Sequence, residues 1–412
     1  MPDATSWSLV LGIWNLKTHT CRVSKLAAMI LCGALALLAG CASAPETPPP
    51  NWSATNQVEE AESQLPARPA MSVTQTNVSL TVKNLVPATM TITNLPIPIK
   101  PVPATNPPAA TNIIKPHVPT VYTWTSLKRW AAEEKINPPL LLSKSPLFSY
   151  SISSDKGVML LAIGSREAMW NGVTLHLGYA PEFIDGEVFV HGLDLQKSLE
   201  PFLCEKLPAF GTNRVIVIDP GHGGINAGTL SVGDHRPEKE FTLDWARRLQ
   251  RLLEQEGWQV FLTRTNDMDV ALSNRVSVAE SRHADLFVSL HFNSLAPDQK
   301  PVGLATFCLT PAGLPSTVTR GYPDVLYQSF PNNNYDTQNV LLAEHLQRAL
   351  VHATGMEDRG VNRARFIGVL RGQRRPAALI EAGFLSNPRE AKRIEDPDFR
   401  QKLAEAVASA LK

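Results

Sequence analysis

The chain has 412 residues, enough for two to three domains of ordinary size. Hydrophobic residues make up 43% of it, so a buried core can form, and the formal net charge is only +1. A chain so close to neutral has no overall polybasic character, so we expect no nucleic-acid partner. The five cysteines show neither a CxxC pair nor regular spacing, which argues against a cysteine-based zinc site and against a disulfide framework.

Residues 1–40 carry the pattern of an export signal. Basic residues precede a short apolar run, 26–38, which leads through Ala-Gly to Cys41. The run is shorter than the about 20 apolar residues that a membrane-spanning helix needs. Its ending resembles that of a lipoprotein signal, which implies cleavage before Cys41 and acylation of the Cys41 thiol. The alternative is an ordinary signal peptide that ends at a cysteine by chance.

Residues 41–118 differ sharply in composition from the rest of the chain. They hold 14 of the 33 prolines, together with many threonines and asparagines and few charged residues. Such a segment cannot bury enough apolar surface to offset the entropy lost on ordering. We therefore expect a disordered linker rich in proline and threonine, which would let the following domains reach away from an anchor.

Residues 119–205 return to a globular pattern. Leu127, Trp130 and Ala131 have helical spacing, and strand-like runs with Asn-Gly and Asp-Gly turns follow, before a short closing helix at about 193–202. This pattern predicts a small α+β domain. Its order of strands and turns is similar to the stalk-like domain first named from the N-terminus of copper amine oxidases, which implies an accessory or binding module.

The last part of the chain, 212–412, alternates apolar strands with helices. This alternation predicts an α/β fold with a twisted, mostly parallel sheet flanked by helices. Three of the apolar runs lead directly to residues that can bind a metal or transfer a proton, namely His222, His291 and Glu381. Parallel strands bring their C-terminal ends to one edge of a sheet, so we expect these three side chains to lie close together.

A helix predicted to end at Gly257 begins at the same edge and has Glu238 and Glu240 in its first turn. Two imidazoles and one carboxylate leave an open coordination position for water, which is the pattern of a catalytic zinc site. A further carboxylate can take the proton from that water. The helical pattern alone slightly favours Glu240 over Glu238, so both stay candidates, and any one of these residues taken alone is more often structural.

Several motifs in this part resemble those of the family 3 N-acetylmuramoyl-L-alanine amidases. They are DPGHGG (219–224), EKEFTL (238–243), TRTND (263–267), Leu272 and Arg275, SLHFNS (289–294) and IEAGFLSN (380–387), in the family's order. The resemblance runs from about 214 to 412. It implies that His222, Glu238 and His291 bind one zinc ion and that Glu381 is the catalytic carboxylate. It also implies the reaction, hydrolysis of the amide between N-acetylmuramic acid and L-alanine in peptidoglycan.

A long segment, 310–337, precedes the helix expected near Gln338. Loops of this length are usually functional lids or disordered. Some relatives carry an inserted segment that blocks the site until a partner moves it, so an activator protein is a further candidate partner, although this segment lacks a long amphipathic helix. Arg371 suits contact with a substrate carboxylate, and a surface ion pair is the alternative.

Peptidoglycan is the expected substrate, and the lipid anchor makes the membrane the second expected partner. Together they favour an exported protein on the periplasmic side of a bacterial outer membrane, while the residues leave the inner membrane open. Two other functions stay in view. One is a zinc peptidase that cuts the stem peptides, and the other is a non-enzymatic peptidoglycan-binding lipoprotein with a decayed site. All four chemical residues are present, which argues against the second.

Overall fold

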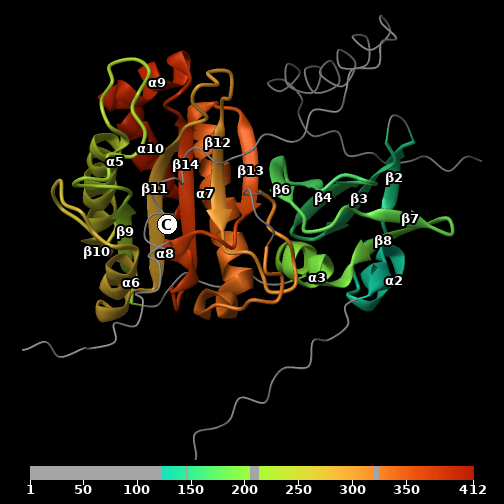
Figure 1. The fold of residues 1–412 in the computed structure, drawn as a ribbon. Coiled ribbons are helices and arrows are strands. Elements are labelled where there is room, and N and C mark those ends of the chain that lie inside the picture. The colour runs from blue at the N-terminus through green and yellow to red at the C-terminus, as the bar shows by residue number, and fades with distance from the viewer. Residues whose placement is uncertain (1–122, 145–146, 205–212, 319–323) are drawn as a thin grey trace, which may run out of the picture. The chain divides into compact units, whose positions relative to one another are not determined.

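The computed structural model describes residues 123–144, 147–204, 213–318 and 324–412 (Figure 1). The predicted export signal, the predicted linker and Cys41 lie outside these residues. Within the described ranges, no helix has both the length and the apolar character needed to cross a bilayer.

The site is carried by an eleven-stranded sheet in the order β10-β9-β11-β14-β12-β13-β6-β5-β4-β3-β2. β9 (Val215–Pro220) runs parallel to both β10 (Gln259–Leu262) and β11 (Leu286–Asn293), and β11 runs parallel to β14 (Ala377–Phe384). β12 (Leu304–Cys308) is antiparallel to β14. The predicted α/β class with a mostly parallel sheet is therefore confirmed for this part of the chain.

Helices cover both faces of this part of the sheet (Figure 1). On one face lie α5 (Glu238–Gln255), α7 (Asp336–Thr354) and α10 (Pro397–Ala410), and α10 contacts both of the others. On the other face lie α6 (Leu272–Ser281) and α8 (Gly368–Arg371), which contact each other. A strand between two such layers is buried on both sides, which is why the apolar runs of β9, β11 and β14 are nearly continuous.

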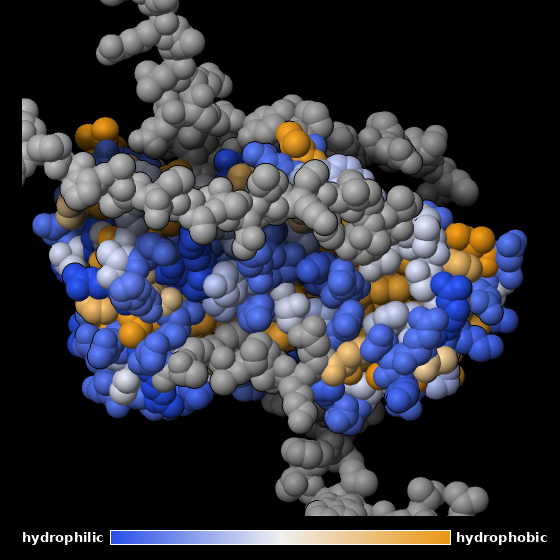
Figure 2. Space-filling model, turned by 90° about the horizontal axis from the view of Figure 1, so that it is seen from below, coloured by the Kyte–Doolittle hydropathy of each residue, from blue (hydrophilic) through white to orange (hydrophobic). Residues whose placement is uncertain are grey.

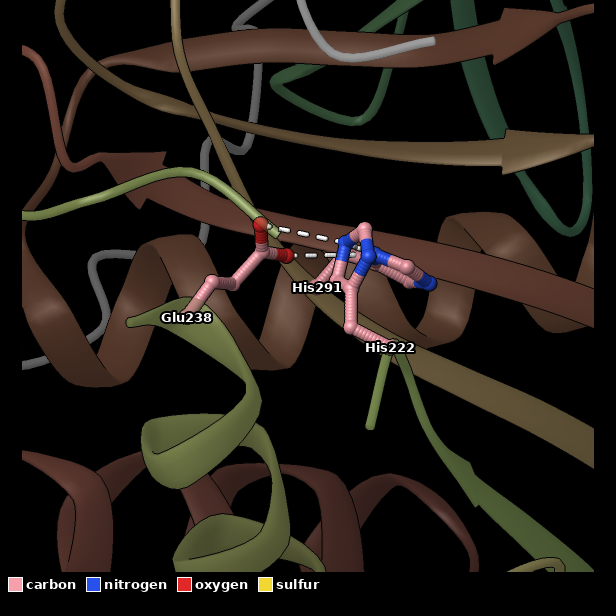
Figure 3. A group of neighbouring side chains, drawn as sticks. All are labelled: His222, Glu238 and His291. Carbon is pink, nitrogen blue, oxygen red and sulfur yellow. Dashed lines mark hydrogen bonds and ion pairs between the residues drawn. The ribbon is translucent and has the colours of Figure 1, made fainter. Parts of the chain in front are cut away.

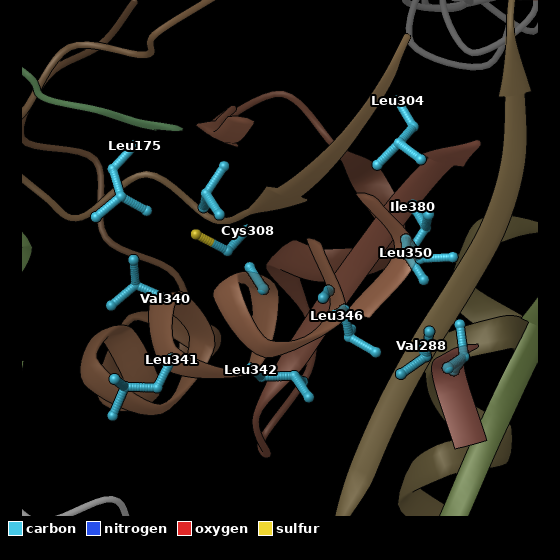
Figure 4. Close-up of a cluster of buried hydrophobic side chains, with 14 of the residues drawn as sticks. Leu175, Val288, Leu304, Cys308, Val340, Leu341, Leu342, Leu346, Leu350 and Ile380 are labelled. Atoms are coloured by element: carbon cyan, nitrogen blue, oxygen red, sulfur yellow. The ribbon is translucent and has the colours of Figure 1, made fainter. Parts of the chain in front are cut away.

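Alternate side chains of each strand enter two different cores. Ile216 and Ile218 join the core under α5 and α7, whereas Val215 and Val217 join the core on the side of α6 and α8. Figure 4 shows the first core, where leucines of α7 pack against β12, β14 and Leu175. The apolar layers hold the strands in one register and so fix where the strand ends lie.

Residues 123–204 also form helices and short strands. These are β1 (Trp124–Ser126), α2 (Leu127–Glu133), β2 (Leu140–Ser143), β3 (Ser149–Ser154), β4 (Gly157–Ala162), β5 (Glu167–Trp170), β6 (Val173–His176), β7 (Glu182–Ile184), β8 (Glu187–His191), α3 (Gly192–Asp194), η1 (Leu195–Leu199) and α4 (Glu200–Leu203). Strands β2 to β6 form an antiparallel meander, and β1, β8 and β7 form a separate small sheet.

The meander continues the large sheet through β6, which runs parallel to β13 (Asp358–Arg363). The backbone N–H of Thr174 donates to the Asp358 carboxylate at 2.8 Å, and the Arg363 guanidinium donates to the Ser198 hydroxyl at 3.0 Å. The predicted accessory and catalytic regions therefore share one sheet. The predicted boundary at 205–212 lies outside the described residues.

The face of the molecule in Figure 2 is mainly hydrophilic, with hydrophobic residues in small separate groups. One run of exposed leucines, 140–142, lies in β2, the strand at one edge of the large sheet.

The junction between β6 and β13 can be tested at Gly360. Its φ is 75°, and a Cβ there would lie 2.7 Å from the backbone oxygen of Thr174. Gly355 has a similar φ of 64° but no atom within 4 Å of its Cβ position, so it is a matched control. We expect Gly355→Ala to cost about 1 kcal/mol of unfolding free energy from the backbone alone. Gly360→Ala should cost about 1–3 kcal/mol more because of the clash. Equal shifts in urea unfolding of the full chain would contradict a close-packed junction.

Candidate metal centre

Three side chains converge at one edge of the sheet (Figure 3). His222 follows β9, Glu238 opens α5 and His291 lies near the end of β11. One ligand atom from each residue lies within 4.8 Å of the others. His222 Nε2 is 3.1 Å from His291 Nδ1, and the two oxygens of Glu238 are 3.1 Å from these same nitrogens. The structure thus brings together the three residues that the resemblance implied as ligands.

Glu240, the alternative carboxylate, lies elsewhere. Its oxygen pairs with the Arg236 guanidinium at 2.9 Å, and its side chain is 47% exposed. Glu238 is fully buried. Residues two positions apart in a helix, such as Glu238 and Glu240, point about 200° apart around the axis. Only one of these two carboxylates can therefore face the histidines.

Glu381 lies on the strand next to His291. The two residues are register partners in the parallel pair β11–β14. Phe287 and Leu379, four and two residues before them, both join the core on the side of α6 and α8. Because side chains alternate along a strand, the Glu381 carboxyl and the His291 imidazole lie on this same face of the sheet.

The loop after β9 leaves no room for side chains beside the cluster. A Cβ on Gly221 would lie 2.2 Å from His291 Cε1, and one on Gly228 would lie 2.6 Å from a carboxylate oxygen of Glu238. His222 itself has a φ of 60°, a left-handed conformation that is uncommon for residues other than glycine. Such a backbone persists only when its surroundings hold it in place.

Two buried arginines hold this loop by its carbonyl oxygens. Arg264 donates to the carbonyls of Pro220 at 2.9 Å and Gly221 at 2.8 Å. Arg275 donates to the carbonyls of Pro220 at 3.0 Å and His222 at 2.9 Å. Arg275 also pairs with the buried carboxylate of Asp219 at 2.7 Å.

The charge of Asp219 is stabilised in this position. Burial alone would raise the pKa of the Asp219 carboxyl, but Arg275 and hydrogen bonds from Thr263 and Ser289 outweigh burial and lower that pKa. Asp219 is therefore ionised at neutral pH and balances the charge of Arg275.

Glu238 is also held as a carboxylate. The backbone N–H groups of Thr229 and Phe292 donate to it at 3.1 and 2.9 Å. Burial alone would raise the pKa of Glu238, but His222 and His291 outweigh burial and hold that pKa far below its ordinary range. In turn, burial would lower the pKa of His222, but the Glu238 charge raises it. The cluster is thus a buried anion facing two imidazoles.

These donor atoms suit a tetrahedral metal ion. Zinc binds histidine nitrogen and carboxylate oxygen at about 2.0–2.2 Å, so neighbouring donors in a tetrahedral site are about 3.3 Å apart. The separations of 3.1 Å in the cluster are close to this value. Two imidazoles and one carboxylate also form a donor set that zinc prefers.

Two other candidates from the sequence, Arg371 and the segment 310–337, make contacts within the protein. Arg371 donates to the carbonyls of Arg365 at 2.9 Å and Phe366 at 2.8 Å, and its guanidinium lies over the Phe330 ring. The segment 310–337 leaves β12 next to the beginning of β14, because these strands are antiparallel. Asn332 in that segment donates to the carbonyl of Arg375, just before β14. The described residues of the segment 310–337 therefore lie near the beginning of β14, at the opposite end of the strands from the cluster.

Sequence reasoning missed Asn226, whose amide oxygen lies 2.8 Å from Nδ1 of His222. It also did not assign the two arginines to the loop carbonyls, although both lie in segments that resemble the family. A polar residue four positions after a histidine carries no recognisable signal, because only the closed loop brings the two side chains together.

Comparison with known proteins finds amidases over the part of the chain that carries the cluster. The family model described as N-acetylmuramoyl-L-alanine amidase matches residues 216–412. The amidase AmiC of Escherichia coli O6:H1 is 32% identical over 244 residues, which cover 53% of this chain and 58% of AmiC. The germination-specific amidase of Bacillus subtilis is 31% identical over 215 residues, which cover 49% of this chain and 78% of that protein. A solved amidase from Clostridium difficile 630 is 31% identical, with a TM-score of 0.40, over 48% of this chain and 96% of its own.

The chain spans 58% of the length of AmiC. The family match covers none of residues 119–205, so the accessory-domain resemblance stays a prediction. For the matched part, the shared identity extends over more than three quarters of the germination-specific amidase, and this chain therefore belongs to the N-acetylmuramoyl-L-alanine amidase family.

Proposed function

We propose that this protein is a zinc-dependent hydrolase of the amide between N-acetylmuramic acid and L-alanine in peptidoglycan. The observation that carries the proposal is the convergence of His222, Glu238 and His291 within hydrogen-bonding distance, in a chain of the amidase family. The names of its relatives support the substrate, and the donor set supports the metal.

In this proposal the three converging residues hold the zinc ion through His222 Nε2, His291 Nδ1 and the Glu238 carboxylate. Bound zinc supplies a Lewis acid that polarises the amide carbonyl and activates water. The Glu238 carboxylate is already ionised and fixed by two backbone N–H groups, so little reorganisation is needed on binding. The strained His222 backbone is held in advance by Arg275.

Glu381 is proposed as the general base and acid. It accepts the proton of the attacking water and returns it to the leaving nitrogen of L-alanine. Its place on the strand beside His291 supports this role, because both side chains lie on the same face at the same register.

The anchor and location remain proposals from the sequence. We propose that Cys41 is acylated and holds the protein on the periplasmic side of a bacterial outer membrane, with the linker giving reach into the wall. An activator protein is a further proposed partner. The described part of 310–337 lies away from the cluster, so it offers no support for a lid over the site.

Activity is tested with the full chain, because the large sheet joins the regions on both sides of 205–212. Zinc-loaded and chelated samples are incubated with purified peptidoglycan, and the products are analysed by mass spectrometry. We expect free stem peptides that begin with L-alanine, released only with zinc. Cleavage inside the stem peptides would instead indicate the zinc peptidase. Zinc binding without release of any peptide would indicate either a non-enzymatic binding protein or an enzyme whose activator is missing.

The choice between the two glutamates is tested by zinc content. We expect Glu238→Ala to lose bound zinc, because one of three protein ligands is gone. Glu240→Ala is the matched control and should keep a full equivalent, because its carboxylate pairs with Arg236 at the protein surface. Zinc loss in the second variant and retention in the first would reverse the assignment.

Glu381→Gln should keep zinc but lower kcat by about 10²–10⁴-fold, the usual contribution of a general acid or base. His222→Ala should lose both zinc and activity. Normal turnover of purified peptidoglycan by Glu381→Gln would remove Glu381 from the mechanism.

The anchor is tested by membrane fractionation. Cys41→Ser should move the protein from the membrane fraction to the soluble fraction and abolish labelling by radioactive fatty acid, because acyl chains supply the membrane affinity. A variant that stays in the membrane fraction would rule out this anchor.

A further inference from the structure

The Asn226 side chain bridges two groups beside the cluster. Its amide oxygen Oδ1 is 2.8 Å from Nδ1 of His222 and accepts the backbone N–H of Gly228 at 3.2 Å. The backbone of Asn226 is fixed as well, because its N–H and carbonyl pair with the carbonyl and N–H of Gly223 at 3.1 and 2.8 Å. The amide therefore stands on a closed turn and has little freedom to rotate away.

These contacts determine which atom of each group faces the other. A backbone N–H can only donate, so the Asn226 atom beside Gly228 must be the carbonyl oxygen and not the NH₂ group. That oxygen can only accept, so Nδ1 of His222 must carry the hydrogen of the neutral imidazole. Nε2 then presents its lone pair toward Glu238 and His291, where a metal ligand needs it.

The other ring contacts of His222 are at Nε2, where the Glu238 carboxylate and Nδ1 of His291 lie 3.1 Å away, on the side where the metal would bind. Arg275 holds the backbone carbonyl of His222 at 2.9 Å. Gly228 leaves room at the ring edge, where a Cβ would lie 2.8 Å from Cδ2. The Arg275 hydrogen bond and the space at Gly228 affect where His222 lies, but not which of its ring nitrogens is protonated. The contact with Asn226 is the one that makes Nδ1 the protonated nitrogen of the metal-binding imidazole.

We propose that Asn226 is a positioning residue for the metal site. Its side chain holds His222 in the Nδ1–H tautomer and in the ring orientation that makes Nε2 the metal ligand. This inference rests on the zinc site of the proposed function. Metal-binding histidines usually donate their second N–H to a carboxylate, a backbone carbonyl or water, and loss of such a partner typically weakens metal binding 10–100-fold. Here a neutral side-chain amide takes that place.

The first test measures zinc affinity of the full chain by competition with a chelator. Asn226→Ala should raise the zinc dissociation constant about 10–100-fold. Asn226→Asp keeps an oxygen acceptor for both His222 and Gly228, so it should bind zinc at least as tightly as the natural protein. Unchanged affinity in Asn226→Ala, or equal loss in both variants, would overturn the proposal.

Asp267→Ala is the matched control for the turn itself. Asp267 accepts the backbone N–H of Gly224 at 2.7 Å and pairs with Lys239, so it fastens the same turn. These two contacts, with Gly224 and Lys239, do not involve His222. We expect the zinc dissociation constant of this variant to stay within about threefold of the natural one, well below the loss expected for Asn226→Ala. A loss as large as that of Asn226→Ala would show that turn stability, and not the hydrogen bond, controls zinc binding.

A second test needs no change at Asn226. In the zinc-loaded protein with ¹⁵N-labelled histidine rings, the His222 signals are assigned by their loss in His222→Gln. We expect a protected Nδ1–H and metal ligation through Nε2, and ligation through Nδ1 would overturn the proposal. Zinc binding by the natural protein without amide hydrolysis would point to a binding protein or a missing activator and leave this inference intact. Equal zinc binding by Asn226→Ala would remove the inference alone.

Discussion

The site depends on how the backbone carbonyls of residues 220–222 are satisfied. The chain turns at the end of β9, where His222 has a φ of 60°, and these carbonyls accept hydrogen bonds from buried side chains. An unpaired buried carbonyl costs free energy comparable to a lost hydrogen bond, so such a turn is unstable alone. The guanidinium groups of Arg264 and Arg275 supply donors to all three carbonyls. Because guanidinium has five donors in a fixed plane, one arginine can hold two successive carbonyls.

These hydrogen bonds require two buried cations, Arg264 and Arg275, close to the proposed zinc site. Asp219 balances Arg275 directly. Burial, with a smaller effect of Arg275, lowers the pKa of Arg264 to about 10, so it still carries its charge at neutral pH. The cost of burying these charges is offset by their hydrogen bonds and by Asp219. The result is a rigid loop in which His222 keeps a left-handed backbone and faces a fully buried carboxylate.

The sheet supplies the rest of the geometry. His291 and Glu381 lie side by side because β11 and β14 are parallel and in register, and their apolar residues enter two well-defined cores. Helix α5 then brings Glu238 over the same edge. The cluster thus combines three elements that are distant in sequence, each fixed by its own packing, and this is the preorganisation that metal catalysis requires.

The sequence by itself determined the α/β class and predicted three of the four candidate site residues, because a long apolar run that ends in a histidine or glutamate marks a buried strand and its C-terminal end. The helical pattern could not choose between Glu238 and Glu240, and only the family resemblance favoured Glu238, since both lie in the first turn of one helix and packing decides which of them faces inward. The sequence also did not indicate β12, β13 or the continuation of the sheet into β6, because strand pairing depends on contacts between distant segments. The roles of Asn226 and of the two arginines were decided by the tertiary structure alone, since a hydrogen bond between a side chain and a closed loop has no sequence period.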